Sequence, residues 1–329
     1  VRCFMATIQD IAEYAGVSAA TVSRVINNSG YVSDETRAIV EKAILELNYV
    51  PNRHAQNLRR GATRNLGIIT SSLNNTVLAR IEPFMEFANE LNYTTTLFHT
   101  YGDPKRELEA LDRLKSKELD GIFIIYRTND WAVIEAYLKY GPIVALHNVE
   151  DDHLNVESVF IDHYDGYKMI LDDLWKHGAR SFINVFSVRT NTNTKRRIQA
   201  YLDFCEEHHL KPHDIEPYLD VSSKEAVMRT LHLIEKMADK PDAIIVHSDQ
   251  VASEFVSYYN KTGVKMPEDT ALVGFDNLHI SELMDFASVD YSIYEQGKNA
   301  WRLRLNALVT HQFELSPLEC KLITRKTTK

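Results

Sequence analysis

Several kinds of protein chemistry have no support in this sequence. The chain holds only three cysteines in 329 residues, Cys3, Cys205 and Cys320, and they do not stand at the spacing of a metal site. Such scattered thiols favour a reducing compartment, so we expect a cytoplasmic protein. No apolar run reaches the length of a transmembrane helix, and the opening VRCFM is too short for a secretory signal.

The motifs of cofactor and phosphate chemistry are missing as well. The sequence has no GxGxxG stretch, no Walker loop and no nucleophile elbow. Asp162 and Asp165 have no acid/base partner that the sequence identifies. The histidine-rich stretch HHLKPH (208–213) lacks a Cys or carboxylate set at ligand spacing, so we interpret it as surface. We therefore expect no enzyme, no cofactor and no metal site.

The informative part of the chain is residues 7–59, which have the pattern of three short helices followed by a hinge. Thr7, Ser18 and Ser33 each precede a stretch of helical periodicity and can cap a helix, while Gly16 breaks the first one. We expect the second helix to extend through Asn27. The apolar spacing predicts inner faces of Ile8, Ile11, Ala12 and Ala15, of Val22, Val25 and Ile26, and of Ile39, Val40, Ala43, Ile44 and Leu47.

Two helices joined by a short Gly-containing turn form the unit that lays its second helix in the major groove of DNA. The outer face of the second helix offers Ala19, Ala20, Thr21, Ser23, Arg24 and Asn27. Arg24 can bind guanine or a phosphate, Asn27 can bind a base or the backbone, and the two alanines can touch thymine methyls. The alternative, an ordinary three-helix bundle, has no need of so many small polar residues on its outer face.

The stretches DIAEYAGVS, ATVSRVIN, VSDETR and LNYVPNRHAQNLR resemble, in order and spacing, the head of the lactose/galactose/purine repressor family of bacterial transcription regulators. The resemblance covers nearly the whole chain. It implies DNA contacts at Ile8, Ser18, Ala19, Ala20, Ser23, Arg24, Asn27, Tyr31, Ser33, Thr36, Tyr49 and Asn52. We expect a DNA-binding head over residues 1–51 and a hinge over residues 52–62.

The hinge is expected to be a short helix that depends on DNA. Asn52 can cap a helix of about two turns, which is marginal in water, so we expect it to form only against DNA and its symmetry mate. Arg53 and Arg59 offer charge to phosphates, and Ala55 belongs to the same contact set. The resemblance implies that Leu58 wedges between base steps of the minor groove, and a buried contact with the core is the alternative.

The charge is unevenly distributed along the chain. The formal net charge is −9, yet residues 1–60 hold seven Lys and Arg against six Asp and Glu, a balance of +1. The remaining 30 basic and 40 acidic residues give −10, so the acidic surplus lies entirely outside the head and keeps DNA away from that part. Because the head is only weakly basic, we expect strong binding to need two heads on one palindrome.

From Leu66 onward, short apolar runs alternate with amphipathic stretches, as in parallel sheets covered by helices on both faces. Strands are predicted at 66–70, 94–98, 121–126, 142–146, 158–161, 181–186, 243–247 and 270–275. Leu108, Leu111 and Leu114 mark one helix stripe, whose intervening charges we interpret as a solvated face. The expected fold class is α/β: an all-α helix-turn-helix head plus a two-lobed, doubly wound parallel-sheet core, which by the resemblance is like periplasmic sugar-binding proteins.

The core over residues 63–329 is expected to divide into two lobes. The chain should cross near residues 162–164 and return near 291–293, and a last helix at about 293–310 should rejoin the first lobe. The first lobe then comprises about 63–162 and 293–318, and the second about 163–292 and 319–329. Because no heptad tail follows the strand expected within 318–324, we expect a homodimer and not a tetramer.

Candidate ligand residues stand at the ends of the predicted strands, where the resemblance implies that an effector binds between the lobes. They are Ser71, Tyr126, His147, Ile161, Arg197, Ser248, Asp276 and Tyr291. Arg197 can bind ligand oxygens through its fork, Asp276 can accept from two hydroxyls, and Tyr126 and Tyr291 can stack on a sugar face. The alternatives are a turn cap for Asp276 and a salt bridge for Arg197.

Half of the polar ligand shell departs from the family pattern. The family often has Asp at the position of His147, Asn at Ser248, Gly at Ala200 and Gln at Tyr291, and a Pro-Phe pair near residues 76–77. The resemblance implies a repressor of palindromic operator DNA that a small ligand, such as a sugar, controls. Corepressor use, or a core that binds a partner protein, stays open. A transport solute-binding protein would require a secretory signal and no DNA head.

Overall fold

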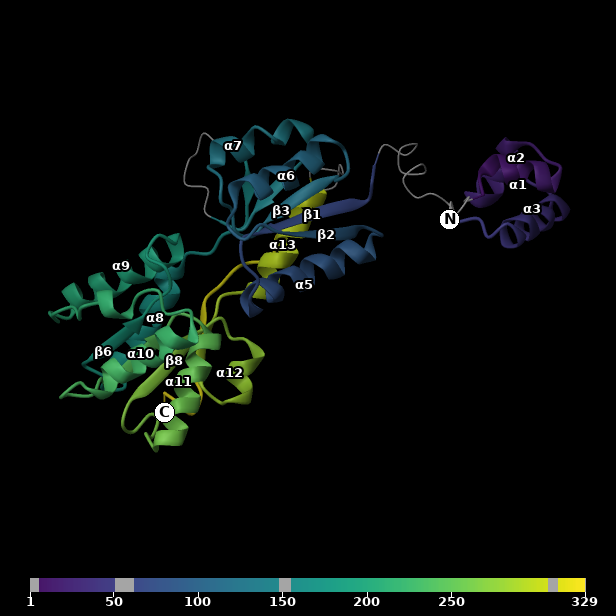
Figure 1. Ribbon diagram of the computed structural model, residues 1–329. Coiled ribbons are helices and arrows are strands. Elements are labelled where there is room, and N and C mark those ends of the chain that lie inside the picture. Colours follow the sequence, from purple (N-terminus) through teal and green to yellow (C-terminus); the bar gives the residue numbers. More distant parts are fainter. Residues whose placement is uncertain (1–5, 51–61, 148–154, 307–312, 329) are drawn as a thin grey trace. The chain divides into compact units, whose positions relative to one another are not determined.

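The computed structural model describes residues 6–50, 62–147, 155–306 and 313–328. The chain divides into two compact units, with the boundary between Arg64 and Asn65. Figure 1 shows a small all-helical unit at the N-terminus and a larger unit of helices and sheets. In the described part of the chain, no helix is both long and apolar enough to cross a membrane.

The small unit consists of the three expected helices, α1 (Ile8–Ala15), α2 (Ala19–Ile26) and α3 (Asp34–Glu46). Thr7 and Asp10 form a reciprocal capping box at the start of α1, which satisfies two backbone donors. Gly16 ends α1 with φ of 65°, a left-handed conformation that glycine adopts without strain. The capped helices bury Ile11, Val22 and Val40 in a small core of their own.

One residue of the predicted inner face of α3 does not lie in that core. Ile39 is 46% exposed, whereas Val40 and Ala43 are buried. Each residue turns a helix by about 100°, which puts Ile39 at the edge of the stripe that Val40, Ala43 and Ile44 define. Ile39 was predicted to be buried because it is apolar. At the edge of a stripe, however, the angular position of the residue around the helix axis decides whether it is buried.

The first lobe of the large unit is built on a five-stranded parallel sheet of order β2-β1-β3-β4-β5. Its strands are β1 (Asn65–Thr70), β2 (Thr94–His99), β3 (Gly121–Ile124), β4 (Ile143–Ala145) and β5 (Glu157–Ser158). Helices α5 (Asn75–Glu90) and α13 (Ile293–Asn306) cover one face, and α6 (Pro104–Lys115) and α7 (Trp131–Glu135) cover the other. The 3-10 turn η1 (Leu138–Tyr140) precedes β4.

The second lobe has a five-stranded sheet of order β10-β9-β8-β7-β6. Its strands are β6 (Phe182–Val185), β7 (Ala243–Val246), β8 (Ala271–Phe275), β9 (Ala287–Asp290) and β10 (Lys321–Ile323). Helices α8 (His163–Lys176) and α9 (Thr192–Glu207) cover one face, and α10 (Lys224–Glu235) and α11 (Asp249–Thr262) cover the other. The short helix α12 (His279–Leu283) and the 3-10 turn η2 (Glu216–Tyr218) lie in its connections. The predicted fold class is confirmed.

Two features of the second sheet differ from the prediction. Strand β9 was missed, because ASVD is short and lacks the apolar run that marks a buried strand. Strand β10 pairs with β9 in antiparallel fashion, so the second sheet is parallel except at this edge. An antiparallel edge strand is common on doubly wound sheets.

A charged residue on α6 lies in the interior of the first lobe. Glu107 directly precedes the stripe of Leu108, Leu111 and Leu114 and is fully buried. Its carboxylate accepts hydrogen bonds from the backbone N–H groups of Thr128 and Asn129, at 2.5 and 2.9 Å, and from the side chain of Asn129. Glu107 therefore holds the loop that follows β3, and these charge-assisted bonds offset its burial.

The chain passes between the lobes three times. It crosses after β5 into α8, returns after β9 into α13, and reaches β10 through residues 313–320. Gly297 permits a close approach of α13 to α5, because a Cβ there would lie 2.3 Å from the backbone oxygen of Arg80. The crossings place the carboxyl ends of strands from both sheets next to each other, where doubly wound folds bind ligands.

Candidate DNA-binding surface and inter-lobe site

Most predicted DNA-contacting residues of the head lie at its surface. Those exposed are Ser18, Ala19, Ala20, Arg24, Asn27, Tyr31 and Ser33, and those half-buried are Ile8, Thr21, Ser23, Thr36 and Tyr49. Tyr31 is 91% exposed, so its side chain is open to a partner outside the head. The described part of the head thus presents α2 with small residues and one cation outward.

Several of these side chains also hold the local backbone in place. Ser18 caps α2 by accepting from the backbone N–H of Thr21, and Ser33 caps α3 in the same way through Thr36. Asn27 donates to the carbonyl oxygen of Ser23 at 2.8 Å. These bonds fix the N-terminus of α2 and leave the guanidinium of Arg24 exposed for a ligand outside the head.

Five predicted contacts, Asn52, Arg53, Ala55, Leu58 and Arg59, lie outside the described residues. They belong to the hinge predicted at 52–62. The hinge helix and the leucine wedge therefore stay predictions.

Three of the candidate ligand residues line one small cavity between the lobes. Tyr126, His147 and Ile161 meet there with Arg80 and His163. The cavity has a volume of about 20 Å³, the space of roughly one water molecule. Its other lining residues are Leu146, Val159, Phe160, Thr192, Asn193 and Gln296. Since a sugar needs far more room, ligand entry would require the side chains or the lobes to move.

A hydrogen-bond network next to this cavity joins the two lobes. Thr76, on α5 of the first lobe, donates to Asp276 at the end of β8 in the second lobe, at 2.9 Å. The hydroxyl of Tyr291 donates to the other oxygen of Asp276 at 2.8 Å and accepts from Arg80 at 2.7 Å. Arg80 also donates to the backbone oxygen of Thr76. Asp276 therefore bonds α5 directly and reaches Arg80 through Tyr291.

Arg197 belongs to a second buried cluster beside that network. Its guanidinium donates to Nδ1 of His163 and to the backbone oxygen of His247, at 2.8 and 2.7 Å. It also lies 3.7 Å from the ring centroid of Phe275. The salt bridge considered as an alternative for Arg197 is made by its neighbour Arg196, which contacts Asp162 at 2.6 Å.

The histidines at this site are neutral at pH 7. Burial, reinforced by the charges of Arg197 and Arg80, holds the pKa of His163 well below its usual value. Burial, together with Arg127 and Arg80, lowers the pKa of His147 to about 4. Because Nδ1 of His163 accepts from Arg197, the proton of the neutral ring must be on Nε2.

Backbone strain concentrates at Asp276. Its φ is 120°, a conformation that non-glycine residues seldom adopt, and the following Asn277 has φ of 49°. Strain of this kind costs about 1–3 kcal/mol and tends to persist at ligand-binding and switching positions. The side chain's bonds to Thr76 and Tyr291 help to hold Asp276 in this conformation.

Three residues of this site were not predicted, because each lies outside the strand ends at which ligand residues were expected: Arg80, Thr76 and His163. A signal for Arg80 was present: a charged residue between Val77 and Ile81, on the apolar stripe of a predicted helix.

Two of the predicted ligand residues do not line the inter-lobe cavity or take part in its hydrogen-bond network. Ser248 caps α11 by accepting from Val251, and Ser71 lies just after β1, half-buried. Their ligand contacts stay predictions.

A second buried carboxylate lies near Asp276 and gives a pH-dependent prediction. Burial, and then the charge of Asp276, raises the pKa of Asp249 to about 8. The folded state thus binds this proton more tightly than the unfolded chain, whose aspartates titrate near ~3.9. The stabilisation from this proton is complete below the pKa of the unfolded chain, and it is lost as the pH rises through the raised pKa of Asp249 in the folded state. The free energy of unfolding in urea should therefore fall between pH 5 and 8.

Asp249→Asn should flatten that dependence, since the amide can still accept from the backbone N–H of Leu278 and donate to Ser288. Asp239→Asn, at an exposed position, should keep the wild-type slope. An unchanged slope in the Asp249 variant would show that another group titrates.

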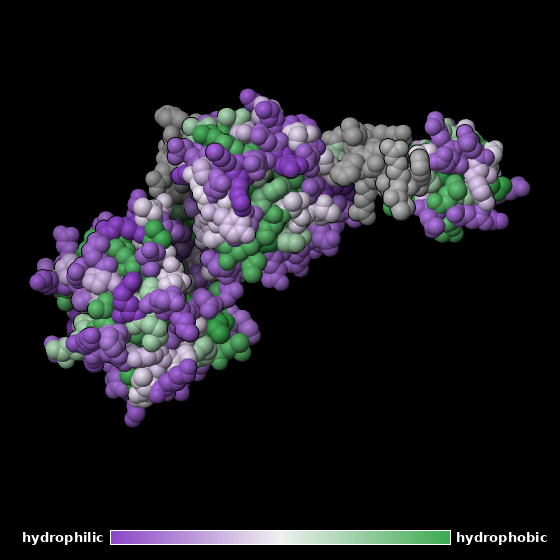
Figure 2. Space-filling view, viewed as in Figure 1, coloured by the Kyte–Doolittle hydropathy of each residue, from purple (hydrophilic) through white to green (hydrophobic). Residues whose placement is uncertain are grey.

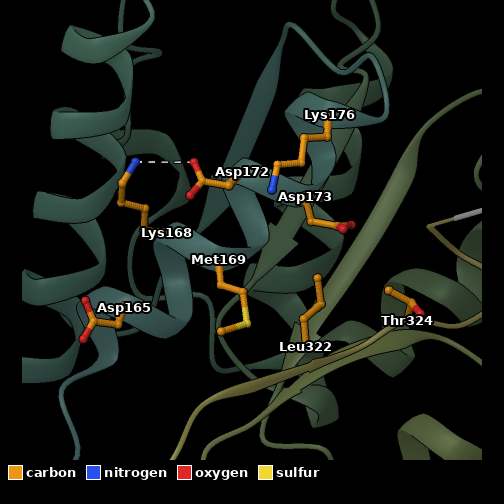
Figure 3. A pocket seen from close by; sticks show the side chains of 8 residues that line it. All are labelled: Asp165, Lys168, Met169, Asp172, Asp173, Lys176, Leu322 and Thr324. Atoms are coloured by element: carbon orange, nitrogen blue, oxygen red, sulfur yellow. Dashed lines mark hydrogen bonds and ion pairs between the residues drawn. The ribbon is translucent and has the colours of Figure 1, made fainter.

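A larger hollow of about 490 Å³ lies on the outside of the second lobe, between α8 and β10. Figure 3 shows its lining, in which Lys168 contacts Asp172. Lys168 also contacts Glu207, so its charge is satisfied, and the hollow contains none of the candidate ligand residues. Among the described residues, no group of three or more His, Cys, Asp and Glu side chains is placed to hold a metal ion.

Comparisons with known proteins agree with both parts of the chain. Residues 7–52 match the family described as bacterial regulatory proteins, lacI family, and residues 171–328 match a periplasmic binding protein-like domain. The NTD biosynthesis operon regulator of Bacillus subtilis is 32% identical, over 98% of this chain and 100% of that protein. Catabolite control protein B of Bacillus subtilis is 31% identical, over 92% of this chain and 94% of that protein.

A third relative and one solved structure extend the comparison. The ribose operon repressor of Halalkalibacterium halodurans is 28% identical, over 99% of this chain and 98% of that protein. The fold matches that of the lac repressor dimer bound to operator and the anti-inducer ONPF, with a TM-score of 0.80, 24% identity and 99% of both chains covered. That structure therefore shares with this chain the fold of a small helical head followed in sequence by a two-lobed unit.

Proposed function

The chain belongs to the lacI family of bacterial regulatory proteins and is a DNA-binding transcriptional regulator, and from this premise we propose that it is a repressor controlled by a small ligand between its lobes. The observation that carries the DNA-binding part of the proposal is the exposed outer face of α2, with Arg24 in the last turn of a helix whose N-terminus Ser18 caps. The lobes act in regulation and not in catalysis, and the protein works in the cytoplasm.

The ligand is proposed to be a carbohydrate bound by Tyr126, His147, Ile161, Arg197, Asp276 and Tyr291, with Ser71 and Ser248 nearby. The name of the ribose operon repressor supports a sugar operon as the target. A ligand that separates or reorients the lobes would break the bonds of Thr76 to Asp276 and of Arg80 to Tyr291. This change would shift the two first lobes of a dimer relative to each other, and the shift would change how the hinges at 52–62 pack against DNA. Because such coupling is reciprocal, operator DNA must also change the affinity for the ligand.

Titration calorimetry of the full chain against a panel of sugars and sugar derivatives tests this proposal. Binding of any member, with a change in DNA affinity, supports ligand control. Loss of DNA affinity would identify an inducer, and a gain would identify a corepressor. Silence across the panel would contradict it and favour a core that binds a partner protein.

The protein is proposed to act as a homodimer on a palindromic operator. Apolar side chains are exposed along α5 and α13 of the first lobe, where Leu78 is 50% and Tyr294 48% exposed. Figure 2 shows apolar surface in the region of these two helices. We expect a second copy of the chain to cover this surface, because a palindromic operator is bound by two heads. Sedimentation equilibrium should give the mass of two chains, and a stable tetramer or a monomer would contradict the proposal.

Arg24→Ala tests the DNA-binding surface. If Arg24 binds a guanine, the substitution should cost roughly 1–3 kcal/mol of operator binding and relax specificity at one base pair of each half-site. Fluorescence anisotropy with the operator and with single-base variants measures both effects. Lys42→Ala is the matched control, because Lys42 is an exposed cation of α3 that contacts Glu46. Equal losses in the two variants would count against base reading by Arg24.

A further inference from the structure

Two guanidinium groups are buried between the lobes without a carboxylate partner. Arg80 is 4% and Arg197 6% exposed, and neither forms an ion pair with an acidic side chain of the described residues. The partners of Arg80 are the Tyr291 hydroxyl and the Thr76 carbonyl oxygen. Those of Arg197 are the His163 ring and the His247 carbonyl oxygen. All four partners are uncharged groups. The buried Asp276 attracts both guanidinium groups without a hydrogen bond to either, so one negative charge faces two positive charges.

Arg80 has an unused donor as well as a charge that is only partly compensated. Its Nε is buried and has no hydrogen-bond partner. Buried donors without a partner are rare in folded proteins, and a buried cation without a counter-ion costs still more. Arg80 lines the inter-lobe cavity, so a molecule that opened this cavity would lie next to its side chain.

The surroundings favour negative charge at this place. Among the described residues that line the cavity, Arg80 carries the only formal charge, and none is a carboxylate. Thr192 and Asn193 also line the cavity and form the first turn of α9, a 16-residue helix whose N-terminus carries partial positive charge. The buried Asp276 is a single acidic group against two guanidinium groups, and it contacts Arg80 only through Tyr291.

We propose that the ligand of the inter-lobe site is an acidic carbohydrate, whose phosphate or carboxylate group binds Arg80 in front of the N-terminus of α9. This inference rests on the proposed function and deepens it by naming the class of ligand. A neutral sugar could accept from the free Nε, but it would leave the surplus positive charge uncompensated. An anion satisfies the donor and the charge together, and the guanidinium fork suits both phosphate and carboxylate.

The first test uses inorganic phosphate and three sugars of one skeleton with the full chain: glucose, glucose 6-phosphate and glucuronate. Calorimetry at matched ionic strength should show saturable binding of at least one of the three anions, at least about tenfold tighter than that of glucose. The ranking of the sugar phosphate against the sugar acid identifies which anionic group the site prefers. The inference is overturned if glucose binds as tightly as every anion, or if no anion binds.

Variants of Arg80 show whether the binding occurs at this residue. Arg80→Met keeps the apolar stem and should weaken the anion by at least about tenfold, whereas Arg80→Lys restores a cation and should recover part of that loss. Arg106→Met removes a half-exposed cation of α6 and should leave the affinity unchanged. Melting curves establish that each variant is folded. Anion binding that survives in a folded Arg80→Met variant would contradict the assignment.

The same titrations separate this inference from the proposed function. If a neutral sugar binds and changes DNA affinity while anions do not, ligand control stands and the acidic class is wrong. If an anion binds at Arg80 and DNA affinity does not change, the site assignment stands and its control of DNA binding is wrong.

Discussion

Replacing Ile11 by alanine is expected to abolish specific DNA binding while the two lobes stay folded. Ile11 is completely buried, at the centre of the small core that joins α1, α2 and α3. Truncating such a residue costs roughly 2–5 kcal/mol. A domain as small as residues 6–50 has a total stability of only roughly 2–7 kcal/mol, at typical values per residue. One substitution is therefore enough to unfold most of the heads.

Ile39→Ala is the matched control, since it removes the same atoms from the same unit at a half-exposed position. It should change the stability of the head by well under 1 kcal/mol, roughly the range for surface substitutions. Operator binding by fluorescence anisotropy and thermal unfolding by circular dichroism measure the two effects in each variant. Full DNA binding by the Ile11 variant, or equal damage in both, would contradict the burial pattern and the independence of the two units.

Tyr291→Phe should strongly destabilise the two-lobed unit. The substitution removes one hydroxyl, yet that hydroxyl accepts from Arg80 and donates to Asp276, both of which are buried. Loss of the hydroxyl leaves a guanidinium N–H and a carboxylate oxygen without a partner. Such groups cost roughly 1–3 kcal/mol each, and more when they are charged. We expect a loss of this size or larger in the free energy of unfolding, together with a shift toward separated lobes.

Tyr258→Phe provides the control for this second prediction. Its hydroxyl donates to Glu235 at 2.7 Å on the surface of the second lobe, where water can replace the lost partner. The control should stay within about 0.5 kcal/mol of the wild type. Urea unfolding measures stability, and small-angle scattering measures the separation of the lobes. A Tyr291 variant as stable as its control would mean that Arg80 and Asp276 pair directly once the hydroxyl is gone.

Most of the secondary structure followed from local rules of sequence. The caps at Thr7, Ser18 and Ser33 and the break at Gly16 depend on neighbouring residues alone, so they could be predicted closely. Strands that are buried on both faces have apolar runs in their sequence, so β1, β3 and β7 could be predicted. Strand β9 and the exposure of Ile39 depend on what packs beside them, and a local pattern does not contain that information.

The inter-lobe site was only half predictable for the same reason. Tyr126, His147 and Asp276 follow strands. They could therefore be predicted from the rule that ligands bind at the carboxyl ends of strands. Arg80 and Thr76 come from the helix after β1, and their partners are more than 190 residues away in sequence. Pairings of that separation are set by how the lobes meet. The unpaired state of Arg80 is visible only once its neighbours are known.

The central claim is that the head reads a specific DNA sequence as a pair. Selection from a pool of random duplex DNA with the full-length protein tests it most directly, because no operator needs to be known beforehand. We expect enrichment of one palindrome, bound at least about 10³-fold more tightly than random DNA at physiological salt, with Arg24→Ala selecting a more degenerate sequence. Enrichment of no sequence, or of a single non-palindromic half-site bound by one chain, would contradict the account.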